Sequence, residues 1–250
     1  MSGTISIRFY EELNDFLPER KRKQRFTHEF VNRPSVKDVI ESLGVPHVEV
    51  DLVLVNGESV DFTYHPENGD HIAVYPVFES LNIQPIHRLR AKPLRQTKFV
   101  LDVHLGKLAN YLRLCGFDTH YENDLDDHEI VEISKIQKRI VLTRDVGLLK
   151  HNNLTHGLWI RSQESRKQLK QVISRLDLAG EVKPFRRCMH CNGILVQVDK
   201  EKILHRLKPK TREYFDEFFQ CRDCEKIYWR GSHYEKMLDW LEEIRREMAE

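Results

Sequence analysis

The chain has 250 residues, of which 40% are hydrophobic and 32% are charged, and its net charge is +1. No apolar run approaches the roughly 18 residues needed to cross a bilayer, and the N-terminus lacks a signal-peptide pattern. The composition thus excludes a membrane-spanning or intrinsically disordered protein and favours a soluble cytoplasmic one. The charge is uneven, because residues 1–80 contain 8 Lys/Arg and 14 Asp/Glu whereas residues 81–250 contain 32 and 25. This asymmetry indicates separate domains, the second better suited to a polyanion, although ordinary scatter of surface charge explains it equally well.

The first 80 residues show the pattern of a small mixed α+β domain. Ser35 is a predicted helix N-cap, Gly44 a predicted helix stop, and Asn56-Gly57 a predicted tight turn between strands. In chain order, we predict strands at 4–10 and 25–31, a helix from 36 to 43, and strands within 50–60 and 68–78. Two strands, a helix and two further strands form a β-grasp layout.

A basic linker separates this region from an alternation of strands and helices. Residues 87–98 contain five Lys/Arg, one proline and no acid. The pattern after the linker predicts strands at 98–101, 117–121, 139–143 and 157–162, and helices at 103–115, 127–138, 164–177 and 234–248. Such alternation predicts an α/β fold with a mostly parallel sheet. Cys115 falls on the apolar face of the first of these helices and is interpreted as a core residue.

Three aspartates stand where a metal site could form. Asp102 follows one predicted strand, Asp145 follows another, and Asp127 lies at a helix start. The carboxyl ends of parallel strands gather catalytic groups, and a carboxylate cluster suits Mg²⁺ or Mn²⁺, which can activate water and stabilise charge on a phosphate. By local pattern alone, a helix N-cap is an equally good interpretation of Asp102 and of Asp127. Beside Asp145, Thr143 and Arg144 could bond a phosphate or orient the acid.

Four of the five cysteines form two C-x2-C pairs, with 29 residues between the pairs. In a chain without a secretion signal, such pairs predict a structural tetrahedral zinc site rather than disulfides. The predicted zinc ligands are Cys188, Cys191, Cys221 and Cys224. After the second pair, Tyr228, Trp229 and His233 could stack on nucleic-acid bases, although packing against the protein explains Trp229 at least as well.

The segments FVLDVHLGKLANYLRLCGFDTHY, DDHEIVEIS, RIVLTRDVGLL and CMHC…CRDCEKIYWRGSHYEKM, spread over roughly 97–240, together resemble the Mut-seven-C domain. That family is a PIN-like ribonuclease domain with a C-terminal zinc ribbon. The resemblance implies a metal-dependent nuclease acting on RNA, with Asp102, Asp127 and Asp145 on its acidic positions.

PIN nucleases usually present a fourth acid, for which Glu122, Asp124 and Glu129 are candidates by proximity in the sequence. Lys107 and Arg113 could contact phosphate, although we favour the solvent face of the helix for both.

The N-terminal region resembles the ubiquitin-like β-grasp domain that is sometimes fused in front of this nuclease domain. It also resembles small sulfur-carrier proteins, but it runs on without their C-terminal Gly-Gly, so we expect a docking or regulatory role. The predicted division is a ubiquitin-like domain at 1–81, a linker at 82–97, a nuclease core at 98–183, and a zinc ribbon with a helix at 184–250. The alternatives to a nuclease are an inactive RNA-binding protein and an adaptor that recruits a protein partner through its β-grasp domain.

Overall fold

The computed structural model describes residues 2–76 and 97–249, which form two compact units. One unit combines residues up to 76 with Asp126–Trp159, and the other combines Thr97–Leu125 with the chain from Ile160 onward. The predicted linker lies outside the described residues except for Thr97, and the predicted nuclease core contributes to both units. The division into four segments stays a prediction. Within the described ranges, no helix is long and apolar enough to cross a membrane.

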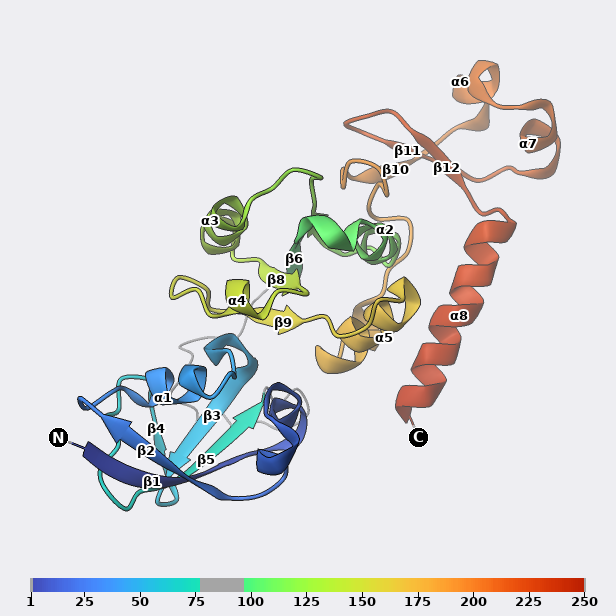
Figure 1. The fold of residues 1–250 in the computed structure, drawn as a ribbon. Helices are drawn as coiled ribbons and strands as arrows, with labels where there is room; N and C mark the ends of the chain where they lie inside the picture. Colours follow the sequence, from blue (N-terminus) through green and yellow to red (C-terminus); the bar gives the residue numbers. More distant parts are fainter. Residues whose placement is uncertain (1, 77–96, 250) are drawn as a thin grey trace. The chain divides into compact units, whose positions relative to one another are not determined.

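The N-terminal region is a five-stranded mixed sheet crossed by one helix (Figure 1). Its elements are β1 (Ser2–Phe9), β2 (Phe26–Val31), α1 (Val36–Ser42), β3 (Val50–Val55), β4 (Glu58–Val60) and β5 (His71–Pro76). The strand order is β2-β1-β5-β3-β4, in which β1 and β5 are parallel and the other neighbours are antiparallel. The predicted β-grasp fold is confirmed.

The core of this sheet follows from alternation along its strands. Ile5, Ile7 and Phe9 of β1 point to one face and are buried against α1, which contributes Val36, Val39 and Ile40. Ser35 caps α1 as predicted, in a reciprocal capping box with Asp38.

Three 3-10 helices of this region lie outside the prediction: η1 (Glu11–Phe16), η2 (Glu19–Lys21) and η3 (His47–Glu49). They are one or two turns long, too short for a helical periodicity to show in the sequence.

The strands between residues 97 and 160 pair in parallel, as predicted. In one unit β6 (Lys98–Leu101) pairs with β7 (Asp118–His120), and in the other β8 (Ile140–Thr143) pairs with β9 (Gly157–Trp159). The helices are η4 (Val103–Leu105), α2 (Gly106–Leu114), α3 (Asp127–Gln137), α4 (Val146–Leu149), α5 (Ser165–Arg175) and η5 (Ala179–Glu181). The predicted α/β class is therefore confirmed, although the single-turn helix α4 was not predicted.

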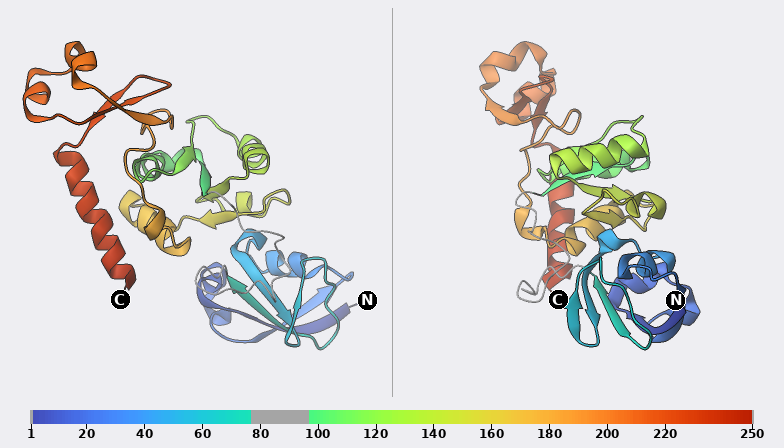
Figure 2. Two further views of the ribbon diagram at one scale, coloured as in Figure 1. Left: turned by 180° about the vertical axis from the view of Figure 1, so that it is seen from behind. Right: turned by 90° about the vertical axis from the view of Figure 1, so that its left-hand side faces the viewer.

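The C-terminal region is an antiparallel ribbon followed by one long helix. The ribbon consists of β10 (Leu195–Val198), β11 (Phe218–Cys221) and β12 (Ile227–Trp229), and the helix is α8 (Ser232–Ala249). Between β10 and β11 lie α6 (Lys200–Ile203), η6 (Leu204–Arg206) and α7 (Pro209–Tyr214), which Figure 2 shows together at the far end of the ribbon. Ile203 and Leu207 from this excursion form a small core with Phe218.

Candidate functional site

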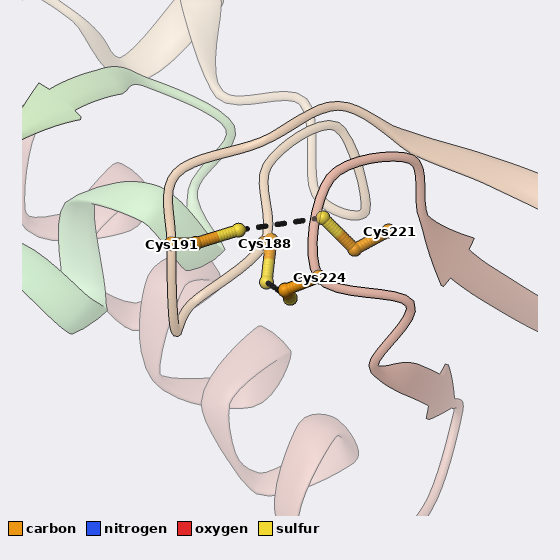
Figure 3. Close-up of side chains that lie close together, drawn as sticks. All are labelled: Cys188, Cys191, Cys221 and Cys224. Carbon is orange, nitrogen blue, oxygen red and sulfur yellow. Dashed lines mark hydrogen bonds between the residues drawn. The ribbon is translucent and has the colours of Figure 1, made fainter.

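The structure brings the four cysteines of the two C-x2-C pairs into one cluster (Figure 3). All four sulfur atoms lie within 4.8 Å of one another. The Sγ atoms of Cys188 and Cys224 are 3.6 Å apart, and those of Cys191 and Cys221 are 3.4 Å apart. A tetrahedral zinc site with Zn–S bonds of about 2.3 Å requires sulfur–sulfur distances of about 3.8 Å. The cluster therefore has the ligands and the size of a four-cysteine zinc site.

Each cysteine pair lies on a tight turn, and the two turns close in the same way. The amide of Asn192 donates to the carbonyl of Cys188 at 2.9 Å, and the amide of Glu225 donates to the carbonyl of Cys221 at 3.1 Å. Asn192 and Glu225, which directly follow the second cysteine of each pair, have positive φ angles of 66° and 57°. A left-handed residue turns the chain back at this point, so the two thiols of each pair face the same space.

The thiols of the cluster have opposed acidities when no cation is present. Burial raises the pKa of Cys188, but hydrogen bonds with the Tyr228 hydroxyl and with the amides of Cys191 and His190 outweigh burial and bring that pKa to about 7. Burial and the neighbouring sulfur atoms raise the pKa of Cys191 to about 12. Four thiolates repel one another unless a cation lies between them, and a coordinating thiol is deprotonated by the metal. Four thiols this close together therefore suit a bound cation.

Arg113 is buried and holds the first cysteine turn. The residue is 5% exposed, so the prediction that it lies on the solvent face of its helix is wrong. The guanidinium donates to the carbonyls of Thr119, Tyr121, Met189 and His190 at 3.0 to 3.4 Å. Because these bonds occupy the guanidinium inside the protein, we assign Arg113 to fixing the ribbon and not to RNA contact.

A second polar link joins the same turn to β7, and no pattern in the sequence signals it. The Asn192 side chain donates to Asp118 Oδ1 at 2.8 Å and accepts from the amide of Thr119 at 2.9 Å. Arg187 forms an ion pair with Asp118 Oδ2 at 3.1 Å. In the sequence, the asparagine that directly follows Cys191 looks like an ordinary turn residue. Its role cannot be seen there because its partners lie more than 70 positions away.

Asp102 directly follows β6 and is a helix cap. Its Oδ1 accepts from the amide of His104 at 2.7 Å, and the residue is 6% exposed. The N-cap interpretation is therefore confirmed. The cap uses a single lone pair of one oxygen atom, so it does not decide whether the same carboxylate binds a metal. Metal binding by Asp102 stays a prediction.

Asp127 is not the cap of its helix. Asp126 caps α3 in a reciprocal box with Glu129, with bonds of 2.8 and 2.9 Å, and Asp127 is the first helical residue. The N-cap interpretation of Asp127 is thus wrong by one position. Asp127 is exposed, while Glu129, a candidate for the fourth acid, has its carboxylate in the capping box.

Asp145 directly follows β8, as predicted, and lies exposed at the start of α4. Its Oδ1 accepts from the amide of Gly147 at 2.6 Å, and its own amide donates to Thr143 Oγ1 at 2.9 Å. A Cβ atom at position 147 would lie 3.0 Å from Oδ1 of Asp145, so glycine leaves space at this carboxylate. Asp127 and Asp145 belong to one unit and Asp102 to the other.

The remaining RNA-contact candidates differ in their surroundings. Lys107 and Arg144 are exposed, whereas Tyr228 is partly buried, with its hydroxyl 3.1 Å from Cys188 Sγ. Burial raises the pKa of Tyr228, which keeps its hydroxyl protonated beside the sulfur. His233 lies in α8, but its side chain is outside the part of the structure that is described.

Trp229 combines the two interpretations given to it. Its ring packs at a tilt against Phe215 and Phe218, with centroids 6.2 and 6.5 Å away, yet 37% of the residue is exposed. The indole therefore has both a packed part and an accessible part.

Two family models match the chain in the order that the sequence predicts. Residues 2–82 match the model described as Mut7-C ubiquitin, and residues 97–241 match the Mut7-C RNAse domain. Comparison with curated proteins and with solved structures gave no match. The second model alone spans more than half of the chain. The chain therefore belongs to the Mut7-C RNAse domain family and has a Mut7-C ubiquitin domain in front of its RNAse domain.

Proposed function

We propose that the protein is a metal-dependent ribonuclease that hydrolyses RNA phosphodiester bonds. The observation that carries this proposal is the match of residues 97–241 to an RNAse domain. Asp102, Asp127 and Asp145 are the proposed ligands of Mg²⁺ or Mn²⁺. Each follows a strand directly or begins a helix, the places where ligand-binding groups gather in α/β folds.

The chemistry of these three side chains fits a hard divalent cation. All the proposed donors are carboxylate oxygens, which Mg²⁺ and Mn²⁺ prefer, whereas zinc prefers the sulfur ligands of the ribbon. When bound, the metal would supply an activated water and stabilise the negative charge that develops on the phosphate. Asp127 and Asp145 are exposed and can therefore be reached by a substrate.

RNA would be held by cationic and aromatic groups of the same domain. Lys107 and Arg144 are exposed cations, and Arg144 directly precedes Asp145, so its charge lies near a proposed metal ligand. The accessible part of Trp229 could stack on a base. The zinc ribbon would have a structural role, since four protein ligands leave no open coordination position for catalysis.

One observation favours the alternative, an inactive RNA-binding or adaptor protein. Glu129 is committed to the capping box of α3, and Glu122 lies 3.4 Å from the ring of His120. Of the three candidates for a fourth acid, only Asp124 is left without such a contact among those described. A site with three acids would bind a cation more weakly than one with four.

The ubiquitin-like domain suits the adaptor alternative, because such domains are protein-interaction modules.

The test is cleavage of single-stranded and structured RNA with Mn²⁺ present. We expect Asp102→Asn and Asp145→Asn to slow cleavage by about 100-fold or more, the scale seen when a group that stabilises transition-state charge is removed. Asp239→Asn, on the exposed side of α8, is the matched control and should cleave at the wild-type rate. Equal rates for all variants would refute the assignment. Salt-sensitive RNA binding by a wild type that does not cleave would favour the alternative.

A further inference from the structure

The turn that precedes β3 in the ubiquitin-like domain is buried, although it contains charged and polar residues. Residues 45–50 are all buried, and within them His47 is 6% exposed and Glu49 is 1% exposed. Burying a carboxylate is costly unless donors compensate for the lost water. The donors to this turn therefore identify what covers it.

The covering segment is the chain from Arg144 to Trp159, which belongs to the same compact unit. Oε1 of Glu49 accepts from the amide of Trp159 at 2.6 Å, more than 100 positions along the chain. Nε2 of His47 lies 2.9 Å from the carbonyl of Leu154, which can only accept, so this nitrogen is the donor of the bond. Both contacts are made to main-chain atoms of the segment and fix the path of its backbone.

Apolar packing completes the contact. Phe16 lies against Trp159 with a centroid distance of 4.9 Å. A Cβ atom at position 157 would come within 2.6 Å of Leu149 and 3.2 Å of Val48, so glycine permits the close approach of the two segments. The ubiquitin-like domain is thus packed closely on β9.

Two lysine contacts lie at the edge of the same surface. Nζ of Lys150 donates to the carbonyl of Glu41 at 3.0 Å, and Nζ of Lys37 donates to Asn152 Oδ1 at 2.8 Å. The contact therefore includes both ends of α1 and the loop between α4 and β9.

Trp159 connects this contact to a proposed metal ligand. Its main chain is bonded to Glu49, its ring packs on Phe16, and its indole Nε1 donates to the carbonyl of Arg144 at 3.2 Å. That carbonyl belongs to the peptide bond between Arg144 and Asp145. The indole bond therefore restrains the backbone from which the Asp145 carboxylate projects.

We propose that Trp159 is a positioning residue for Asp145, and that Glu49 of the ubiquitin-like domain holds Trp159 in place. The ubiquitin-like domain then supports the proposed active site directly. Its side formed by α1 and η3 is covered by residues 144–159 of the same chain. The functional part of this inference rests on the proposed role of Asp145 as a metal ligand.

The sharpest test uses Trp159→Phe in the full chain. This change keeps an aromatic ring against Phe16 and the main-chain bond to Glu49 but removes the donor to Arg144. Trp240→Phe, in α8, is the matched control. Hydrogen exchange of residues 144–149 should be faster in Trp159→Phe and unchanged in the control. Binding of Mn²⁺ to the zinc-loaded protein, followed by the electron paramagnetic resonance signal of free Mn²⁺, should weaken by about threefold to tenfold, the effect of losing one hydrogen bond.

Glu49 provides the second variant pair. Glu49→Gln keeps an oxygen acceptor for the Trp159 amide, so the exchange rate of residues 144–149 and the affinity for Mn²⁺ should change by less than about threefold. Glu49→Leu leaves that amide unpaired, so the exchange rate and the Mn²⁺ affinity should change by more than in Glu49→Gln.

The outcomes separate the two proposals. Wild-type exchange and wild-type Mn²⁺ binding in Trp159→Phe would overturn the positioning role, as would faster exchange with unchanged Mn²⁺ binding if Asp145→Asn weakens binding. If Asp145→Asn binds Mn²⁺ like the wild type, the metal-ligand assignment is wrong, and the exchange data alone then decide whether Trp159 holds the turn.

Discussion

Single residues show how a charged side chain can be structural. Arg113 lies one helical turn after the buried Ala109, so the buried face of α2 is wide enough to include it. Its burial is compensated because Arg carries five N–H donors in a rigid fork, which here meet four carbonyls. Burial lowers the pKa of this guanidinium, which still remains protonated at any ordinary pH. Lysine, with a point charge on a flexible stem, could not satisfy the same set.

We expect Arg113→Met to destabilise the ribbon's attachment. The substitution keeps an apolar stem but leaves buried carbonyls without donors, which should lower the free energy of unfolding by about 2–4 kcal/mol. Lys107→Met, an exposed change on the same helix, should shift it by less than about 0.5 kcal/mol. Urea unfolding followed by circular dichroism measures both, and release of zinc to a coloured chelator should be faster only in Arg113→Met. Equal stability and zinc release in the two variants would show that the four contacts contribute nothing.

At the scale of an element, α3 separates the structural acids from the candidate catalytic one. Asp126 and Glu129 bond to each other's backbone amides and complete the capping box, while Asp127 between them takes no part in it. Three neighbouring acids thus divide into two that form the capping box and one whose carboxylate takes no part in it. The cap accounts for Asp126 and Glu129 and not for Asp127.

The division can be measured with neighbouring substitutions. Asp126→Ala should cost about 1 kcal/mol of stability because it removes the cap, while leaving Mn²⁺-dependent cleavage within about threefold of wild type. Asp127→Asn should cost only about 0.3 kcal/mol, through loss of a charge near the helix N-terminus, but should slow cleavage strongly. Asp126→Asn is the control, since asparagine also caps a helix. If Asp127→Asn cleaves normally, Asp127 is not a metal ligand.

At the scale of the whole molecule, the sequence predicted what local periodicity and fixed spacing encode. The β-grasp order came from alternating strands and the Ser35 cap, and the cysteine cluster came from two short spacings. The burial of Glu49 and of Arg113 could not be predicted in this way. The burial of each side chain depends on partners that are distant in the chain or lie outside any helical or strand period. A single sequence does not show which backbone groups will need a donor or an acceptor.

The hydrophobic cores of the protein differ in size, so removal of the proposed zinc ion should have a local effect. The ubiquitin-like domain buries a large apolar cluster between α1 and its sheet, whereas the core at the cysteine turns consists of Cys188, Leu195 and Cys221 with a few partly buried aromatic residues. Together with the small core of Ile203, Leu207 and Phe218, this core is too small to offset the conformational entropy of the ribbon, and small zinc domains usually unfold without metal.

We therefore expect a strong chelator to abolish hydrogen-exchange protection in residues 186–229 while residues 2–76 keep theirs. Cys221→Ser should reproduce the loss without chelator, because it removes one of the four thiolates, and added zinc should restore protection in the wild type but not in this variant. If residues 186–229 stay protected after the metal has been removed, their own packing suffices, and zinc is not what stabilises the ribbon.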